Sequence, residues 1–159
     1  MKEKWQALTL PAPVQQLVKQ KQVEDKMTNP FRDQEKFMRA CDQSVDGSNQ
    51  DQFKMYLGLI KEEFLELLVA QGIDPSTGDQ VKAVDMVETL DALLDIVVVT
   101  IGAMHSAGMD AEGGWKEVMS TNFAKIDKET GKVRKREDGK VLKPQGWTPP
   151  KLAPFITKK

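Results

Sequence analysis

Two acidic segments decide the fold: IKEEFLELL at residues 60–68 and VETLDALLDIVVV at residues 87–99. Both segments repeat apolar residues at helical spacing and insert carboxylates into that apolar pattern. Residues three, four or seven apart share one face of a helix, so each predicted helix presents a stripe of carboxylates. The stripes consist of Glu62, Glu63 and Glu66 in the first segment and Glu88, Asp91 and Asp95 in the second.

Asp95 has the most apolar surroundings of these residues, because Leu93 and Leu94 precede it and the run 96–99 follows it. An isolated ionised carboxylate buried there would cost several kcal/mol unless it were paired or bound to a metal. A divalent cation is the simplest single partner for several carboxylates on facing helices, and Mg²⁺ prefers oxygen ligands. The sequence therefore predicts a metal site between the two helices.

Helical periodicity extends well beyond the acidic segments. We expect helices at about 31–43, 51–71, 81–107 and 111–124, with Gly72 and Gly108 marking two of their ends. This pattern predicts an all-α bundle of four to five helices. The apolar residues expected in the core of the first two helices are Phe31, Phe37, Met38, Cys41, Phe53, Tyr56, Leu57, Ile60, Phe64, Leu67 and Leu68.

Proline and glycine divide the chain into three regions. We expect an N-terminal extension at 1–30, an all-α domain at 31–126 and an irregular C-terminal tail at 127–159. The tail contains two glycine turns and is expected to form a small hairpin. Trp147 is an unusual residue for a free tail, so we predict that it packs the tail on the body or on a neighbouring subunit.

Composition narrows the possible partners. The chain has 159 residues and a net charge of −1, which suits one domain and offers no overall attraction to nucleic acid or to anionic membranes. The longest apolar run is too short to span a bilayer. The single Cys41 cannot form an internal disulfide and no charged and apolar leader opens the chain, so we expect a cytoplasmic protein.

The acidic pattern resembles that of the all-α nucleoside triphosphate pyrophosphohydrolases, the MazG and phosphoribosyl-ATP pyrophosphohydrolase-like group. Residues 62–66, EEFLE, match the EExxE motif of this family, and residues 88–91 fit its ExxD motif. Asp95 resembles the aspartate that precedes the family's apolar run, but Ala92 then stands where a glutamate would be. The choice of metal ligands among Glu88, Asp91 and Asp95 therefore stays open.

Three later segments, IGAMHSAGMD at 101–110, STNFAKID at 120–127 and REDGKVLKPQGWTPP at 136–150, resemble a phage and bacterial branch of the same group. The resemblance covers about residues 31–150. If the protein is encoded by a phage, the expected location is the host cytoplasm. A helical hairpin with few other partners cannot bury both of its faces alone, so we expect a homo-oligomer, a dimer or a tetramer. The resemblance points the same way.

The resemblance implies a hydrolase that cleaves the α–β phosphoanhydride bond of a nucleoside or deoxynucleoside triphosphate. The products are the monophosphate and pyrophosphate, and the purpose is control of a nucleotide pool. Mg²⁺ is the implied cofactor, and Mn²⁺ could replace it. The implied metal ligands are Glu63, Glu66, Asp91, Asp95 and Glu88, the implied catalytic residues are Glu62 and Glu63, and the implied substrate-binding residues are Asn122 and Lys125.

Three other interpretations compete with this one. A di-iron carboxylate bundle needs Glu-x-x-His pairs, and Gly102 stands three residues before His105, the only histidine. The basic run at 132–143 could contact nucleic acid, although Glu137 and Asp138 interrupt it, which favours a solvated tail. The acidic stripes could instead be the face of a non-catalytic helical interaction module that binds no metal.

Overall fold

The computed structural model describes residues 11–12 and 28–156. Within this part of the chain all regular structure is helical, apart from isolated β-bridges, which confirms the predicted all-α fold. Most of the predicted N-terminal extension, residues 1–10 and 13–27, lies outside the described residues. The elements are α2 (Pro30–Ala40), α3 (Gln50–Ala70), α4 (Met86–Ser106), α5 (Ala111–Phe123) and the short 3-10 helix η1 (Ala153–Phe155).

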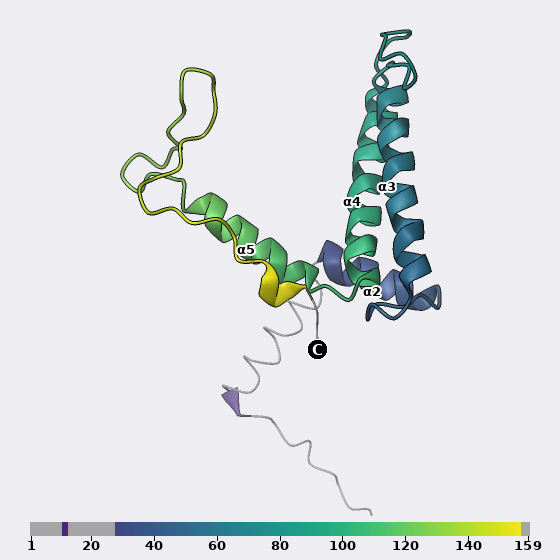
Figure 1. Cartoon of the computed structure of the whole chain (residues 1–159), viewed down its shortest axis with the longest axis horizontal. Helices are drawn as coiled ribbons and strands as arrows, with labels where there is room; N and C mark the ends of the chain where they lie inside the picture. Colours follow the sequence, from purple (N-terminus) through teal and green to yellow (C-terminus); the bar gives the residue numbers. More distant parts are fainter. Residues whose placement is uncertain (1–10, 13–27, 157–159) are drawn as a thin grey trace, which may run out of the picture.

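Helices α3 and α4 form a long antiparallel hairpin, and α2 crosses its base (Figure 1). Each long helix begins at a side-chain cap that satisfies free backbone N–H groups. Asn49 accepts from the backbone of Gln52, and Asp85 accepts from Val87 and Glu88. The two acidic segments therefore lie on neighbouring antiparallel helices, each of which begins at a defined cap residue.

The core is small and lies at the base of the hairpin, where α2, α3 and α4 meet. Met38, Tyr56, Val99 and Ala103 are buried there. Gly102 permits this contact, because an added Cβ would lie within 2.9 Å of three atoms of the Tyr56 ring. The Tyr56 hydroxyl donates to Gln43 at 2.7 Å, so the buried ring keeps its polar end paired.

Two predicted helix boundaries are wrong. The helix expected from residue 81 begins at Met86, because Val81 and Lys82 donate their backbone N–H groups to the carbonyl of Gly72 instead of to a helix. The helix expected to reach residue 43 ends at Ala40, where the N–H groups of the next residues turn back to the last helical carbonyls. At the start of α4 and at the end of α2, hydrogen bonds of loops and turns set the helix boundary, although the apolar periodicity continues beyond it.

Four residues expected in the core are instead exposed. Phe37 is 62% exposed, Phe64 52% and Leu57 48%, and Cys41 is also exposed. Phe37 lies on α2, which buries Gln34 and Met38 instead, and Cys41 follows directly after that helix. Leu57 and Phe64 lie on the hairpin, where two helices packed side by side can bury only the seam between them and leave their outer faces uncovered. An apolar surface therefore runs along the hairpin.

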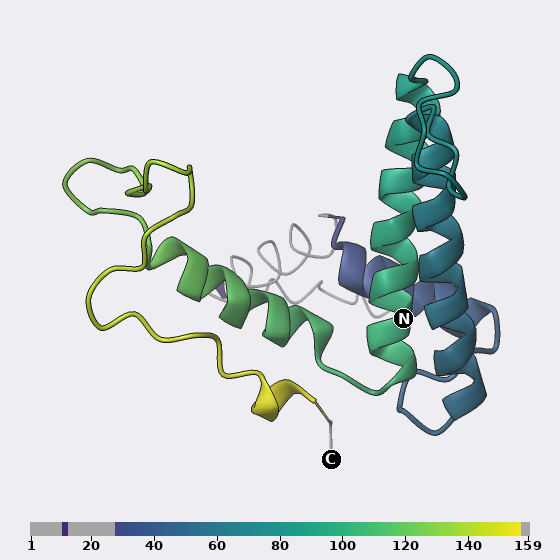
Figure 2. The same cartoon turned by 45° about the horizontal axis from the view of Figure 1, so that its top comes forward.

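Helix α5 leaves the base of the hairpin and the C-terminal tail returns alongside it (Figure 2). Trp147 donates its indole N–H to the carbonyl of Thr121 at 2.8 Å, and Lys151 donates its backbone N–H to Glu117 at 2.8 Å. Antiparallel bridges join Ile126 to Val133 and Lys135 to Val141. The two hydrogen bonds hold the tail against α5, and the bridges fold the tail on itself. Among the described helices, none has the length and apolar content needed to cross a bilayer.

Candidate metal-binding site

Glu63 on α3 and Asp95 on α4 are the half-buried members of the acidic cluster, whereas its other members are exposed. Partial burial raises the pKa of Glu63 above its ordinary value, because the charged form loses solvation. Neighbouring negative charges raise this pKa further. They belong to Glu66, Asp95, Glu62 and Asp91, in decreasing order of effect.

The charges that raise the pKa of Glu63 come from both helices. Two of the four charges that raise it come from α3 and two from α4. Of the six acidic residues singled out from the sequence, Glu62, Glu66, Asp91 and Asp95 therefore act on Glu63 by their charge, and Glu88 does not.

A groove of about 540 Å³ opens beside this pair of helices. Its acidic lining comes from both helices, and Lys82 from the connecting loop adds one positive charge. Glu88 enters the site here, whereas Glu63 and Asp95 lie outside the groove lining. The acidic residues that line the groove are Glu62, Glu66, Glu88 and Asp91.

The donor chemistry of this cluster fits a hard divalent cation, since every candidate ligand is a carboxylate oxygen. Across residues 11–12 and 28–156, however, no three or more acidic, histidine or cysteine side chains are already arranged to hold a metal. Ionised carboxylates without a cation repel one another, and the exposed glutamates can rotate. Metal binding would therefore require these side chains to converge. A bound cation would turn the repulsion around Glu63 into attraction.

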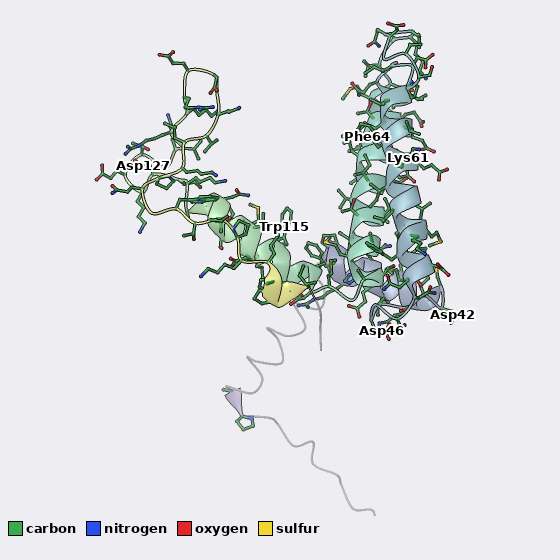
Figure 3. All side chains as sticks on the ribbon, viewed as in Figure 1. Asp42, Asp46, Lys61, Phe64, Trp115 and Asp127 are labelled. Carbon is green, nitrogen blue, oxygen red and sulfur yellow. The ribbon has the colours of Figure 1, made fainter. Side chains whose placement is uncertain are left out.

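The structure does not bring Asn122 and Lys125 to the acidic cluster of the same chain. Both lie at the end of α5, where Lys125 Nζ donates to Asn122 Oδ1 at 2.8 Å. Asp127, two residues further on, lies in the tail, well apart from Lys61 and Phe64 on the hairpin (Figure 3). Within one chain, the predicted substrate residues and the predicted metal ligands form two separate groups.

Sequence reasoning missed Lys82, and it noted Lys143 only as the end of the basic run 132–143 and not as a neighbour of Trp147. Lys82 is the only basic residue of the loop between α3 and α4, which is the signal that could have identified it beside the acidic groove. Lys143 lies with its Nζ 4.5 Å from the centroid of the Trp147 ring. No local motif marks it, because the contact depends on how the tail folds.

Comparison with known families agrees with this geometry. The family model described as phosphoribosyl-ATP pyrophosphohydrolase matches residues 32–122, which is more than half of the chain and includes both acidic stripes. A comparison with the curated proteins finds no match. The chain therefore belongs to the phosphoribosyl-ATP pyrophosphohydrolase family, within the MazG-like all-α nucleoside triphosphate pyrophosphohydrolases, and is a hydrolase of the pyrophosphohydrolase type.

Proposed function

We propose that this protein hydrolyses the α–β phosphoanhydride bond of a nucleoside or deoxynucleoside triphosphate, releases the monophosphate and pyrophosphate, and so controls a nucleotide pool. The observation that supports this most directly is that carboxylates of both α3 and α4 line one groove and act by their charge on Glu63. Family membership supplies the reaction class. The alternative, a non-catalytic interaction module, has no use for a mutually repelling cluster that raises the pKa of one member.

The proposed roles follow from position. Glu63, Glu66, Asp91 and Asp95, together with Glu88 at the groove, would hold Mg²⁺ or Mn²⁺. When bound, the ion would neutralise phosphate charge and lower the pKa of water. Glu62 lies about 100° from Glu63 around the helix, so its carboxylate can accept a proton from the attacking water without being a ligand itself.

A substrate panel tests the reaction class. The panel contains the eight common ribo- and deoxyribonucleoside triphosphates and phosphoribosyl-ATP, each with Mg²⁺, and chromatography separates the products. We expect monophosphate and pyrophosphate from at least one common triphosphate, because the cluster would orient water toward the α–β bond. The ranking would then identify the base and sugar that the protein prefers.

Other outcomes of the panel would change the proposal. Diphosphate and orthophosphate would contradict cleavage at the α–β bond. Turnover of phosphoribosyl-ATP alone would keep the reaction but replace the substrate class. No product from any compound, with Mn²⁺ also tested, would contradict the proposed activity on triphosphates.

We also propose that the working form is a homo-oligomer, at least a dimer. The apolar outer face of the hairpin supports this, since Val87 is 77% exposed, Met86 70% and Leu90 59%. Large apolar side chains exposed close together on one helix are typical of protein interfaces. Light scattering coupled to size exclusion should therefore give a mass of two or four chains, and Leu90→Glu should lower it. A monomer at micromolar concentration would contradict this proposal.

A further inference from the structure

Lys82 places one positive charge in the acidic groove between α3 and α4. The groove lining contains four carboxylates, and Lys82 is its only basic residue. Within residues 11–12 and 28–156, Lys82 forms no ion pair with any of these carboxylates. The charge of its ammonium group is therefore available to a ligand that enters the groove.

The backbone of Lys82 is fixed by several contacts. Its N–H group donates to the Gly72 carbonyl at 3.3 Å, beside the shorter bond that Val81 makes to the same carbonyl at 2.7 Å. Its carbonyl oxygen accepts from the side-chain amide of Gln80 at 2.6 Å, and this amide also donates to the Gln71 carbonyl. An added Cβ at Gly72 would clash with the Lys82 carbonyl oxygen. The loop thus holds Lys82 at a defined position, although its side chain is exposed.

Lys82 lies toward the tip of the hairpin, because the loop that carries it joins α3 to α4 at the end away from α2 (Figure 1). Along α3 the groove lining ends at Ala70, seven residues beyond Glu63, and along α4 it begins at Glu88, seven residues before Asp95. Seven residues of helix correspond to about 10 Å. The half-buried pair Glu63 and Asp95 therefore lies about two turns nearer to the base than the end of the groove at Lys82.

The groove lacks a second positive group for a polyphosphate. Its carboxylates attract a divalent cation but repel phosphate oxygens, so any phosphate that extends beyond the cation needs another positive partner. A lysine ammonium group carries three donors and binds phosphate as a point charge. Among the residues that line the groove, Lys82 alone can provide this contact.

The proposed reaction creates negative charge on the leaving group. The oxygen of water bonds to the α-phosphorus, its proton passes to Glu62, and the bond from the α-phosphorus to the bridging oxygen breaks. The electron pair of that bond leaves with pyrophosphate, where a nearby ammonium group would stabilise it. We infer that Lys82 binds the β- and γ-phosphates, so that the triphosphate lies along the hairpin with its terminal phosphate toward the tip. This inference rests on the proposed function, since it names the part of the substrate that Lys82 contacts.

Two titrations of the full chain test the inference without turnover. The first uses Mn²⁺ alone, after bound metals have been removed on a chelating resin. The second uses inorganic pyrophosphate in the presence of saturating Mg²⁺. Isothermal titration calorimetry gives both Kd values, and the ionic strength is kept low because salt screens exposed charges.

Lys82→Ala should change the two affinities in opposite directions. Pyrophosphate binding should weaken by about tenfold, the usual scale for losing a charge-assisted hydrogen bond. Mn²⁺ binding should become about two- to threefold tighter, because a positive charge that repels the metal is removed. A distorted loop would instead weaken both, so the opposite signs separate the effect of charge from that of structure. Lys82→Arg keeps the charge and should leave both Kd values within about threefold of wild type.

The matched control is Lys61→Ala. Lys61 is also an exposed lysine of the hairpin, but it lies on α3 outside the groove lining (Figure 3). Its replacement removes the same charge, so both affinities should stay within about twofold of wild type. In steady-state kinetics, Lys82→Ala should lower kcat/KM for the best triphosphate by about tenfold. Binding of the corresponding monophosphate should not change, because it lacks the β- and γ-phosphates.

Three results would overturn the inference and leave the proposed function standing. They are an unchanged pyrophosphate affinity in Lys82→Ala, weaker binding of both ligands in that variant while circular dichroism shows an intact fold, and an equal loss in Lys61→Ala. A wild-type chain that binds no Mn²⁺ would contradict the proposed function itself, and the inference with it.

Discussion

Replacing Asp95 with asparagine should lower kcat for nucleotide hydrolysis by about 100-fold or more, the usual scale for losing a charged group that stabilises the reacting centre. Asp95 is half-buried on α4 and its charge acts directly on Glu63. Asparagine keeps the shape of the side chain but removes the charge, so the helices should remain formed. Steady-state kinetics with the best substrate of the panel, together with circular dichroism, measures this.

The matched control is Asp51→Asn. Asp51 lies in the first turn of α3, is 92% exposed and pairs only with the exposed Lys54 at 3.1 Å. Its replacement removes one carboxylate from the same helix pair but leaves the acidic cluster around Glu63 unchanged. Activity should therefore stay within about twofold of wild type. An active Asp95→Asn variant, or an Asp51→Asn variant equally impaired, would remove Asp95 from the proposed site.

Saturating Mg²⁺ should raise the melting temperature of the wild-type chain by about 5–10 °C. A ligand at 100 times its Kd stabilises the folded state by about 2.7 kcal/mol, and about 2–4 °C per kcal/mol applies to a chain of this size. The gain arises because the ion replaces repulsion among the carboxylates around Glu63 with attraction. Thermal denaturation with and without Mg²⁺, at fixed protein concentration, measures the shift.

Glu63→Gln should separate the repulsion among the carboxylates of the metal-free protein from the stabilisation that Mg²⁺ adds. The pKa of Glu63 is raised in the folded state, so the folded chain holds this proton more tightly than the unfolded chain does. Stability from this group is therefore present at low pH and is lost as the pH rises through the folded pKa. At neutral pH, Glu63→Gln should make the metal-free protein more stable and reduce the Mg²⁺ shift. A melting temperature unmoved by Mg²⁺ in wild type, with and without nucleotide, would favour the interaction module.

The hairpin illustrates what sequence can predict. The helices and their order follow from apolar spacing, and the pairing of acidic stripes follows from two helices that are consecutive in the chain, connected by residues 71–85. The exposure of Leu57 and Phe64 does not follow, because periodicity identifies an apolar face but not what covers it. The start of α4 at Met86 depends on backbone hydrogen bonds to the carbonyl of Gly72, and the apolar periodicity of the sequence does not reveal such bonds.

The C-terminal tail shows the opposite limit. Lys125 could be singled out from the sequence, but its relation to Lys143 depends on a turn at Gly146 and on one bond from Trp147 to Thr121, 26 residues apart. Contacts of this separation are set by the folded tail as a whole. The sequence also could not predict that Asn122 and Lys125 lie apart from the carboxylates, because the direction of α5 depends on the short connection after Ser106.

The hairpin of α3 and α4 also has a kinetic consequence. Its two helices are consecutive in the chain and pack mainly on each other, so most of its contacts are local and its contact order is low. Chains of this kind fold within microseconds to milliseconds. Burial of the outer apolar face must then wait for an encounter between chains, whose rate rises with concentration. The slow step in producing the proposed oligomer should therefore be second order, and dilution should delay assembly without delaying helix formation.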